Sequence, residues 1–102
     1  MIKHIVMWKL KEVAEGKTKQ ENAEIMKELL EGLPAKIKEL DSAEVGINIL
    51  KGEDAAICDV VLTTICEDEG ALNAYAVHPE HQKVVQFIKK VVEERRVVDY
   101  FN

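Results

Sequence analysis

The first ten residues constrain the fold most strongly, because they alternate as a strand does while carrying large apolar side chains on both faces. One face would hold Ile2, His4, Val6, Trp8 and Leu10. The other would hold Lys3, Ile5, Met7 and Lys9. Successive side chains of a strand point to opposite faces, so this pattern predicts a strand over residues 2–10. Both of its faces carry apolar groups that gain from being covered.

Two segments carry the signals of helices that pack an apolar side on a flat surface. Thr18 and Glu21 have the spacing of a capping box, in which each side chain satisfies a free backbone N–H at a helix start. Pro34 cannot continue the hydrogen-bond ladder and lies just past the expected end of that helix. Asp68 is expected to cap a short helix ahead of Pro79, where a second long helix begins. The stripes of the two long helices are Ile25, Met26, Leu29, Leu30 and Leu33, and His81, Val84, Val85, Ile88, Val91 and Val92.

Three further segments alternate or are rich in β-branched residues, and they predict strands at residues 44–49, 55–66 and 96–101. Turn-forming residues at 51–54 separate the first two, which indicates a hairpin. The full order is strand, helix, strand, strand, helix, strand. This is the ferredoxin-like (βαββαβ) arrangement of the α+β class, a four-stranded antiparallel sheet with helices on one face. We expect a single domain over residues 1–102.

The predicted sheet has one face that no helix covers. If residues such as Trp8 lie on that face, water would meet an aggregation-prone apolar patch. An isologous dimer covers the patch most simply, because both copies present the same face. A chain of 102 residues is also small enough for a lone core to stabilise it only modestly. We therefore predict a homodimer whose sheets face each other, with Trp8 facing the dimer core.

Composition excludes several classes of partner. The chain is 47% hydrophobic and 32% charged, which indicates a folded protein, and its net charge of -5 argues against nucleic-acid binding. No segment approaches the roughly 20 apolar residues of a membrane span, and the N-terminus has no long apolar region of a secretory signal. Cys58 and Cys66 lie outside any CxxC pattern and are expected to be reduced, so a cytoplasmic location is the default.

Three stretches together resemble a known family over essentially the whole chain. They are Met1-Ile2-Lys3-His4-Ile5-Val6-Met7-Trp8-Lys9-Leu10, Ala74-Tyr75-Ala76-Val77-His78-Pro79-Glu80-His81 and Arg96-Val97-Val98-Asp99-Tyr100. The chain is similar in them to the stress-responsive A/B barrel (Dabb) family. The resemblance implies a ferredoxin-like unit that dimerises into an α/β barrel, in agreement with the strand and helix order.

The resemblance also implies a candidate chemistry. Plant polyketide cyclases of the olivetolic acid cyclase type close a linear polyketide by aldol condensation without a cofactor. By position, His81 would match the general base, Tyr75 the tyrosine ahead of the motif, and His4 the histidine of the first strand. The third strand departs from this pattern, because it offers residues such as Val60 where the cyclase adds another histidine.

The residues themselves leave several readings open. A histidine titrates near neutral pH, so His81 beside a tyrosine hydroxyl could remove a proton alpha to a carbonyl, and it could equally pack as part of the helix stripe. His78 precedes Pro79 and could cap the following helix or contact a ligand. His4 and Trp8 could line a cavity or simply pack.

Two histidines three positions apart, His78 and His81, make a thin metal site because catalytic zinc normally takes three protein ligands, so no metal is predicted. Asp59 lies in an apolar run and must be near a strand end, paired or functional.

Three candidate functions remain. The first is a cofactor-free pocket protein that binds a small apolar, carbonyl-bearing or aromatic ligand, with His81 and Tyr75 as acid and base. The second is a non-enzymatic dimer used in stress protection or assembly, and the third and weakest is a monooxygenase of the related barrel superfamily.

Overall fold

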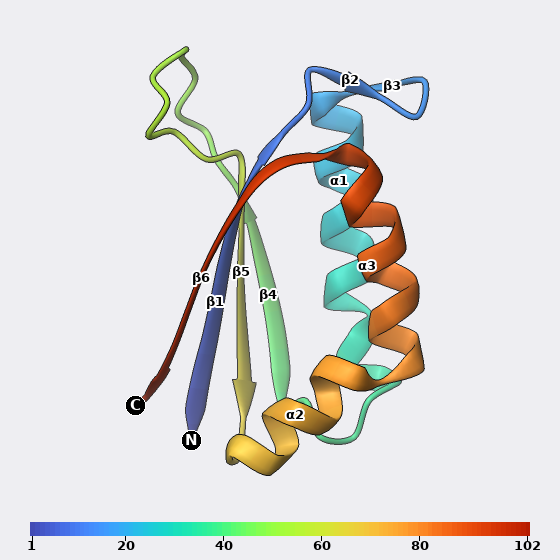
Figure 1. Ribbon diagram of the computed structural model, residues 1–102, viewed down its shortest axis with the longest axis vertical. Coiled ribbons are helices and arrows are strands. Elements are labelled where there is room, and N and C mark those ends of the chain that lie inside the picture. The colour runs from blue at the N-terminus through green and yellow to red at the C-terminus, as the bar shows by residue number, and fades with distance from the viewer.

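The computed structural model describes all residues 1–102 and has one helical layer packed on one sheet (Figure 1). The strands of the main sheet are β1 (Ile2–Leu10), β4 (Ser42–Ile47), β5 (Val60–Cys66) and β6 (Val92–Phe101). The helices are α1 (Lys19–Glu31), α2 (Glu69–Val77) and α3 (Pro79–Val91), with a short 3-10 turn, η1 (Leu33–Ala35), after α1. A small hairpin, β2 (Val13–Ala14) and β3 (Lys17–Thr18), precedes α1.

The sheet has the strand order β4-β5-β1-β6, and every neighbouring pair is antiparallel. This is the ferredoxin-like α+β fold that the element order predicts. β1 is central: it pairs with β5 from Ile2 to Trp8 and with β6 from Ile2 to Leu10. Figure 1 shows the two chain ends side by side, and the N–H of Asn102 donates to the carbonyl of Met1 at 3.2 Å.

The helices begin where the sequence predicts, because their caps form. Thr18 and Glu21 make the reciprocal capping box of α1, and the Asp68 carboxylate accepts from the N–H of Ala71 at the start of α2. Pro79 occupies the first turn of α3, where its missing N–H costs nothing. α1 ends before Pro34, as expected, although Pro34 itself continues the chain as the 3-10 turn η1.

Four strand boundaries differ from the prediction, and one of them is the start of β4, which lies at Ser42 and not at residue 44. The Asn48 side chain accepts from the N–H of Leu50 at 2.8 Å and ends β4 at Ile47. Asp54 in turn accepts from the N–H of Ala56 at 2.8 Å, so the apolar run begins as a turn and β5 starts only at Val60. Residues 48–59 therefore form an irregular segment, which we call the arm. β6, in contrast, begins at Val92, because it pairs with the full length of β1. Between β1 and α1, residues 13–18 form the β2–β3 hairpin, whose turn places Glu15 and Gly16 at positive φ.

The core lies between the sheet and the helices, and it includes Trp8. Trp8 is 4% exposed and packs in one cluster with β1, α1, β5 and α3 residues. The prediction that Trp8 faces the dimer core on the bare side of the sheet is therefore wrong. Both faces of β1 are apolar, so the alternation alone did not say which face the helices cover. The helix-covered face is that of Val6, Trp8 and Leu10.

The opposite face of the sheet, which we call the open face, carries the alternate residues of each strand. Met7 is 40% exposed there, Val98 52% and Tyr100 42%. By the strand register, its apolar residues are Ile5 and Met7 of β1, Val61 and Ile65 of β5, and Val98 and Tyr100 of β6.

The two edges of the sheet are treated differently. At the β4 edge, the N–H of Val45 donates to a Glu31 carboxylate oxygen at 3.0 Å, and the Lys27 ammonium donates to the Val45 carbonyl at 2.6 Å. These α1 side chains take the place of a neighbouring strand. At the other edge, β6 is hydrogen-bonded only to β1, and nearly all of its residues are exposed. The sheet thus has one blocked edge and one free edge.

Candidate functional site

A cavity of about 500 Å³ lies between the sheet and the α2–α3 layer, and we call it the site cavity. Its walls are mostly apolar, with contributions from the strands β1, β5 and β6 and from all three helices. Its ionisable and aromatic lining residues are His4, Trp8, Tyr75, His81, Lys89, Arg95 and Asp99. A mostly apolar cavity of this size with a few convergent polar groups is typical of a small-molecule site.

Tyr75 lies in the last turns of α2 and is 1% exposed. Its hydroxyl is buried and has no hydrogen-bond partner in the protein. Burial raises the pKa of the Tyr75 phenol well above its usual range, so the group stays protonated. It is therefore a hydrogen-bond donor without an acceptor, at the wall of the site cavity.

His81 lies in the first turn of α3, and the sharp α2–α3 corner brings its ring to Tyr75. The two ring centroids are 4.4 Å apart. His81 Nδ1 lies 3.0 Å from the carbonyl oxygen of Ala76, and because a carbonyl only accepts, Nδ1 must carry the proton. Burial lowers the pKa of His81, the Ala76 hydrogen bond opposes this, and the charges of His4 and Arg95 lower it further. The ring is thus neutral at neutral pH, with the lone pair on Nε2.

His4 lines the cavity from β1 and is held by β6. Its Nδ1 is hydrogen-bonded to an Asp99 carboxylate oxygen, the residue directly opposite it in the β1–β6 register. The edge of the His4 ring meets Tyr75 at a centroid distance of 6.0 Å, with the rings nearly perpendicular. The carboxylate fixes the tautomer and orientation of His4, leaving Nε2 free for another partner.

Trp8 also lines the cavity. Its indole Nε1–H is buried and has no hydrogen-bond partner. Tryptophan N–H groups usually find an acceptor when they are buried. The lining of the site cavity therefore includes two residues with unpartnered donors, Trp8 and Tyr75.

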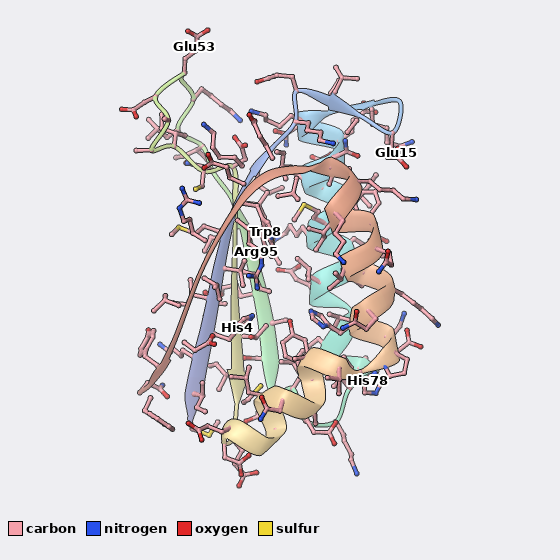
Figure 2. All side chains as sticks on the ribbon, viewed as in Figure 1. His4, Trp8, Glu15, Glu53, His78 and Arg95 are labelled. Atoms are coloured by element: carbon pink, nitrogen blue, oxygen red, sulfur yellow. The ribbon has the colours of Figure 1, made fainter.

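His78, the remaining residue predicted to contact a ligand, lies at the α2–α3 corner and not in the cavity lining. Its Nδ1 accepts from the backbone N–H of Glu80 at 3.1 Å, so it caps α3. Figure 2 shows it apart from His4 and Trp8. The structure thus brings together four of the five predicted site residues and leaves His78 outside. It contains no group of three or more His, Cys, Asp or Glu side chains that could hold a metal ion.

Asp99 and Arg95 are cavity residues that the sequence did not single out. A usable signal existed in the strand pairing, because in the antiparallel β1–β6 register Asp99 falls opposite His4 and Arg95 opposite Trp8. The register depends on the length of β6, which was underestimated at its start.

Asp59 has a structural role. Its carboxylate accepts from the N–H of Leu10 at 2.7 Å and lies 3.4 Å from the Lys19 ammonium. Of the readings left open for this residue, the paired one is confirmed. It ties the end of β1 to the base of the arm.

A larger hollow of about 920 Å³, the arm groove, lies between the arm and the open face. Its walls are mostly apolar and include Met7, Ile49 and Leu50, with Ile49 95% exposed. No buried polar group without a partner points to a small ligand there. The site cavity is therefore the better candidate for chemistry. None of the helices is both long and apolar enough to span a bilayer.

Comparison with known proteins agrees with this fold. The profile of the Stress Responsive A/B Barrel Domain family (Dabb) matches residues 2–102. A dimeric protein of unknown function and ferredoxin-like fold from Bacteroides fragilis is 32% identical, with a TM-score of 0.80 over 97% of this chain and 93% of that chain. A dimeric ferredoxin-like protein of unknown function from Thermobifida fusca is 25% identical, with a TM-score of 0.77 over 97% and 88%.

A hydroxynitrile lyase from Passiflora edulis is 13% identical, with a TM-score of 0.79 over 97% of this chain and 90% of that chain, so the likeness concerns the fold. No curated protein matches the sequence significantly.

Proposed function

The chain belongs to the stress-responsive A/B barrel domain (Dabb) family, and from this membership and the site geometry we propose that it binds a small, largely apolar molecule in the site cavity. The ligand carries a carbonyl or an aromatic ring. We propose further that the protein acts on it as a cofactor-independent acid–base catalyst of the lyase or cyclase kind, with His81 as base and Tyr75 as acid.

The observation that carries this proposal is the Tyr75 hydroxyl, which is buried in the cavity wall without an acceptor. An unsatisfied buried donor costs roughly 1–3 kcal/mol. A ligand oxygen in the cavity would satisfy it. The Trp8 Nε1–H has the same need on the same cavity. Two such groups at one cavity are better explained by a bound acceptor than by packing.

The chemistry follows from the protonation states. Neutral His81, with its lone pair on Nε2, removes a proton alpha to the ligand carbonyl. The electron pair of that C–H bond forms the C=C bond of an enolate, the π pair of the carbonyl moves onto its oxygen, and the Tyr75 O–H donates to that oxygen. The enolate then attacks a second carbonyl, as in a cyclase, or expels a leaving group, as in a lyase. The His81 imidazolium then gives its proton to the alkoxide formed in the cyclase step or to the leaving group of the lyase step.

One protein of the same fold, from Passiflora edulis, is a hydroxynitrile lyase. That activity belongs to the relative, and the identity of 13% carries only the architecture.

Proton exchange in D₂O tests the proposal without knowledge of the natural substrate. Acetophenone and 1-phenyl-1,3-butanedione are incubated with the protein, and loss of the alpha-proton signal is followed by NMR. We expect exchange above the buffer rate, falling by about 100-fold or more toward the buffer rate in His81→Asn. Tyr75→Phe should slow it as well.

His78→Asn is the matched control, because asparagine keeps the helix cap and the position lies outside the cavity. It should exchange protons at the wild-type rate. Equal rates in His81→Asn and wild type, or no exchange together with no ligand-induced shift of the Trp8 indole signal, contradict the acid–base proposal.

A second candidate function, a structural or stress-protection homodimer, is favoured by the open face. Ile5, Met7, Val61, Ile65, Val98 and Tyr100 would be left in water on a lone chain. The similar solved proteins from Bacteroides fragilis and Thermobifida fusca are described as dimeric. We propose that a second copy covers this face, forming an α/β barrel, and that the exposed arm residues Ile49 and Leu50 extend the contact.

The two unpaired cysteines, Cys58 and Cys66, favour a cytoplasmic location.

Light scattering after size-exclusion chromatography tests the dimer. Met7→Glu places a charge in the centre of the open face and should give monomers. Val13→Glu is the control, because Val13 is 70% exposed on the β2–β3 hairpin, away from that face. If dimers persist unchanged in Met7→Glu, the interface lies elsewhere. The structural homodimer is the only function left if the wild type dimerises and His81→Asn alters neither the dimer nor the proton-exchange rate.

A further inference from the structure

Arg95 is a charged residue of the site cavity whose guanidinium has no partner. It lies on β6 directly opposite Trp8, and so on the helix-covered side of the sheet. Figure 2 shows the Arg95 and Trp8 labels together in the space between the sheet and the helices. The guanidinium makes no ion pair and no side-chain hydrogen bond. Its neighbour Arg96, on the opposite face of the same strand, lies 3.4 Å from a Glu94 oxygen.

The charges around the cavity leave Arg95 available. The other cation of the lining, Lys89, also forms no ion pair, and the one acid, Asp99, is hydrogen-bonded to His4. Asp99 is four residues along β6 from Arg95, which is about 13 Å at the rise of a strand. The Arg95 end of the cavity is therefore a place of net positive charge.

The positive charge of Arg95 also reaches the reacting groups. Burial is the main reason that the pKa of His81 is lowered, and Arg95 lowers it further. Arg95 likewise opposes the rise that burial produces in the pKa of Tyr75. Arg95 therefore acts electrostatically on both residues of the proposed acid–base pair, and it lines the same cavity as they do.

Three groups of the cavity lining offer N–H or O–H donors that no other group of the protein accepts: the buried Trp8 indole N–H, the buried Tyr75 hydroxyl and the exposed Arg95 guanidinium. We propose that the ligand of the site cavity is a small organic carboxylate with an apolar body. The carboxylate receives the forked N–H groups of Arg95, and the body packs on the apolar wall beside Trp8. A guanidinium matches a carboxylate in two parallel hydrogen bonds, which an isosteric neutral amide cannot reproduce. This inference rests on the proposed small-molecule function and names the class of ligand.

Three matched pairs of compounds test it: benzoate and benzamide, 2-naphthoate and 2-naphthamide, and hexanoate and hexanamide. Binding to the full chain is measured by calorimetry and by the NMR shift of the Trp8 indole N–H. We expect at least one acid to bind about 10- to 100-fold more tightly than its amide, the range of a hydrogen bond to a charged group. Arg95→Gln should remove that preference while leaving the amide affinity unchanged.

Arg96→Gln is the closest control, because it removes the same charge from the same strand on the opposite face. Lys83→Gln removes a charge from an exposed side chain of α3 that lies outside both the sheet and the cavity lining. This side chain is 73% accessible and pairs with Glu80. Both variants should keep the acid preference.

The outcomes separate this inference from the function on which it rests. Acid and amide binding equally, with Arg95→Gln without effect, overturns the carboxylate assignment and leaves a neutral-ligand pocket. A loss of acid preference that is as large in Arg96→Gln as in Arg95→Gln shows general charge attraction and also overturns it. No shift of the Trp8 signal with any of the six compounds overturns both the carboxylate and the pocket.

Discussion

Removing the Tyr75 hydroxyl should make the protein more stable and less active. The side chain is 1% exposed, and its oxygen has no hydrogen-bond partner, so folding strips the hydroxyl of water and returns nothing. The penalty for such a group is about 1–3 kcal/mol. Phenylalanine keeps the ring and its contacts, including the one with His81, and loses only the oxygen. The free energy of unfolding of Tyr75→Phe should therefore rise by about 1 kcal/mol.

For a chain of this size, a gain of about 1 kcal/mol raises the melting temperature by about 4–8 °C. Urea unfolding and thermal unfolding, both at one fixed protein concentration, measure the change without ligand. Tyr100→Phe, made in the Met7→Glu background so that the open face stays in water, removes the same atom from a side chain that is 42% exposed, and it should change stability by less than about 0.5 kcal/mol.

The result that refutes this reasoning is a Tyr75→Phe protein that unfolds more easily than wild type. That loss would mean that the hydroxyl has a partner in the unliganded protein. The Tyr75 hydroxyl would then not be an unpaired donor that a ligand satisfies, and the main support for the acid–base site would disappear.

Three further predictions concern His81, Asp59 and the blocked sheet edge. The NMR titration of His81 should give a pKa below 6.5, and a pKa above 6.5 contradicts the burial argument. Because the folded protein then binds this proton less readily than the unfolded chain, the free energy of unfolding should not depend on His81 well above pH 6.5. It should fall as the pH drops from 6.5 to the pKa of the folded protein. Asp59→Ala leaves the N–H of Leu10 without its acceptor and should lower the free energy of unfolding by about 1–3 kcal/mol in urea, with the exposed Asp54→Ala as a smaller-effect comparison. Glu31→Ala uncovers the N–H of Val45 and should increase aggregation on heating, followed by light scattering, whereas Glu28→Ala on the same helix should not.

The sequence was sufficient for the fold because its signals were local. The capping box at Thr18, the Asp68 cap and Pro79 each act within one helical turn, and all three helices begin where these signals predict. The strand ends were less predictable, because Asn48 and Asp54 compete for backbone N–H groups with their side chains and turn an apolar run into the arm.

The candidate site was predicted only in part for a different reason. Tyr75 and His81 stand on one corner of the chain, six residues apart, and a motif can contain them both. Arg95 and Asp99 reach the same cavity only through the pairing of β1 with β6, and no local pattern reports that register. Trp8 was placed on the wrong face, because both faces of β1 are apolar. The alternation of side chains shows which residues share a face of the strand, but it does not show which face the helices cover.

The unequal edges of the sheet limit how copies of the chain can join. Lys27 and Glu31 occupy the bonding positions of Val45 on β4, while β6 keeps its outer backbone groups free. In the language of polymers, such a unit has one reactive end. Two units that meet through β6 close on each other and stop, whereas a unit with two free edges would continue into a fibril. The Lys27–Glu31 ion pair beside β4 thus opposes the addition of further copies at that edge of the sheet.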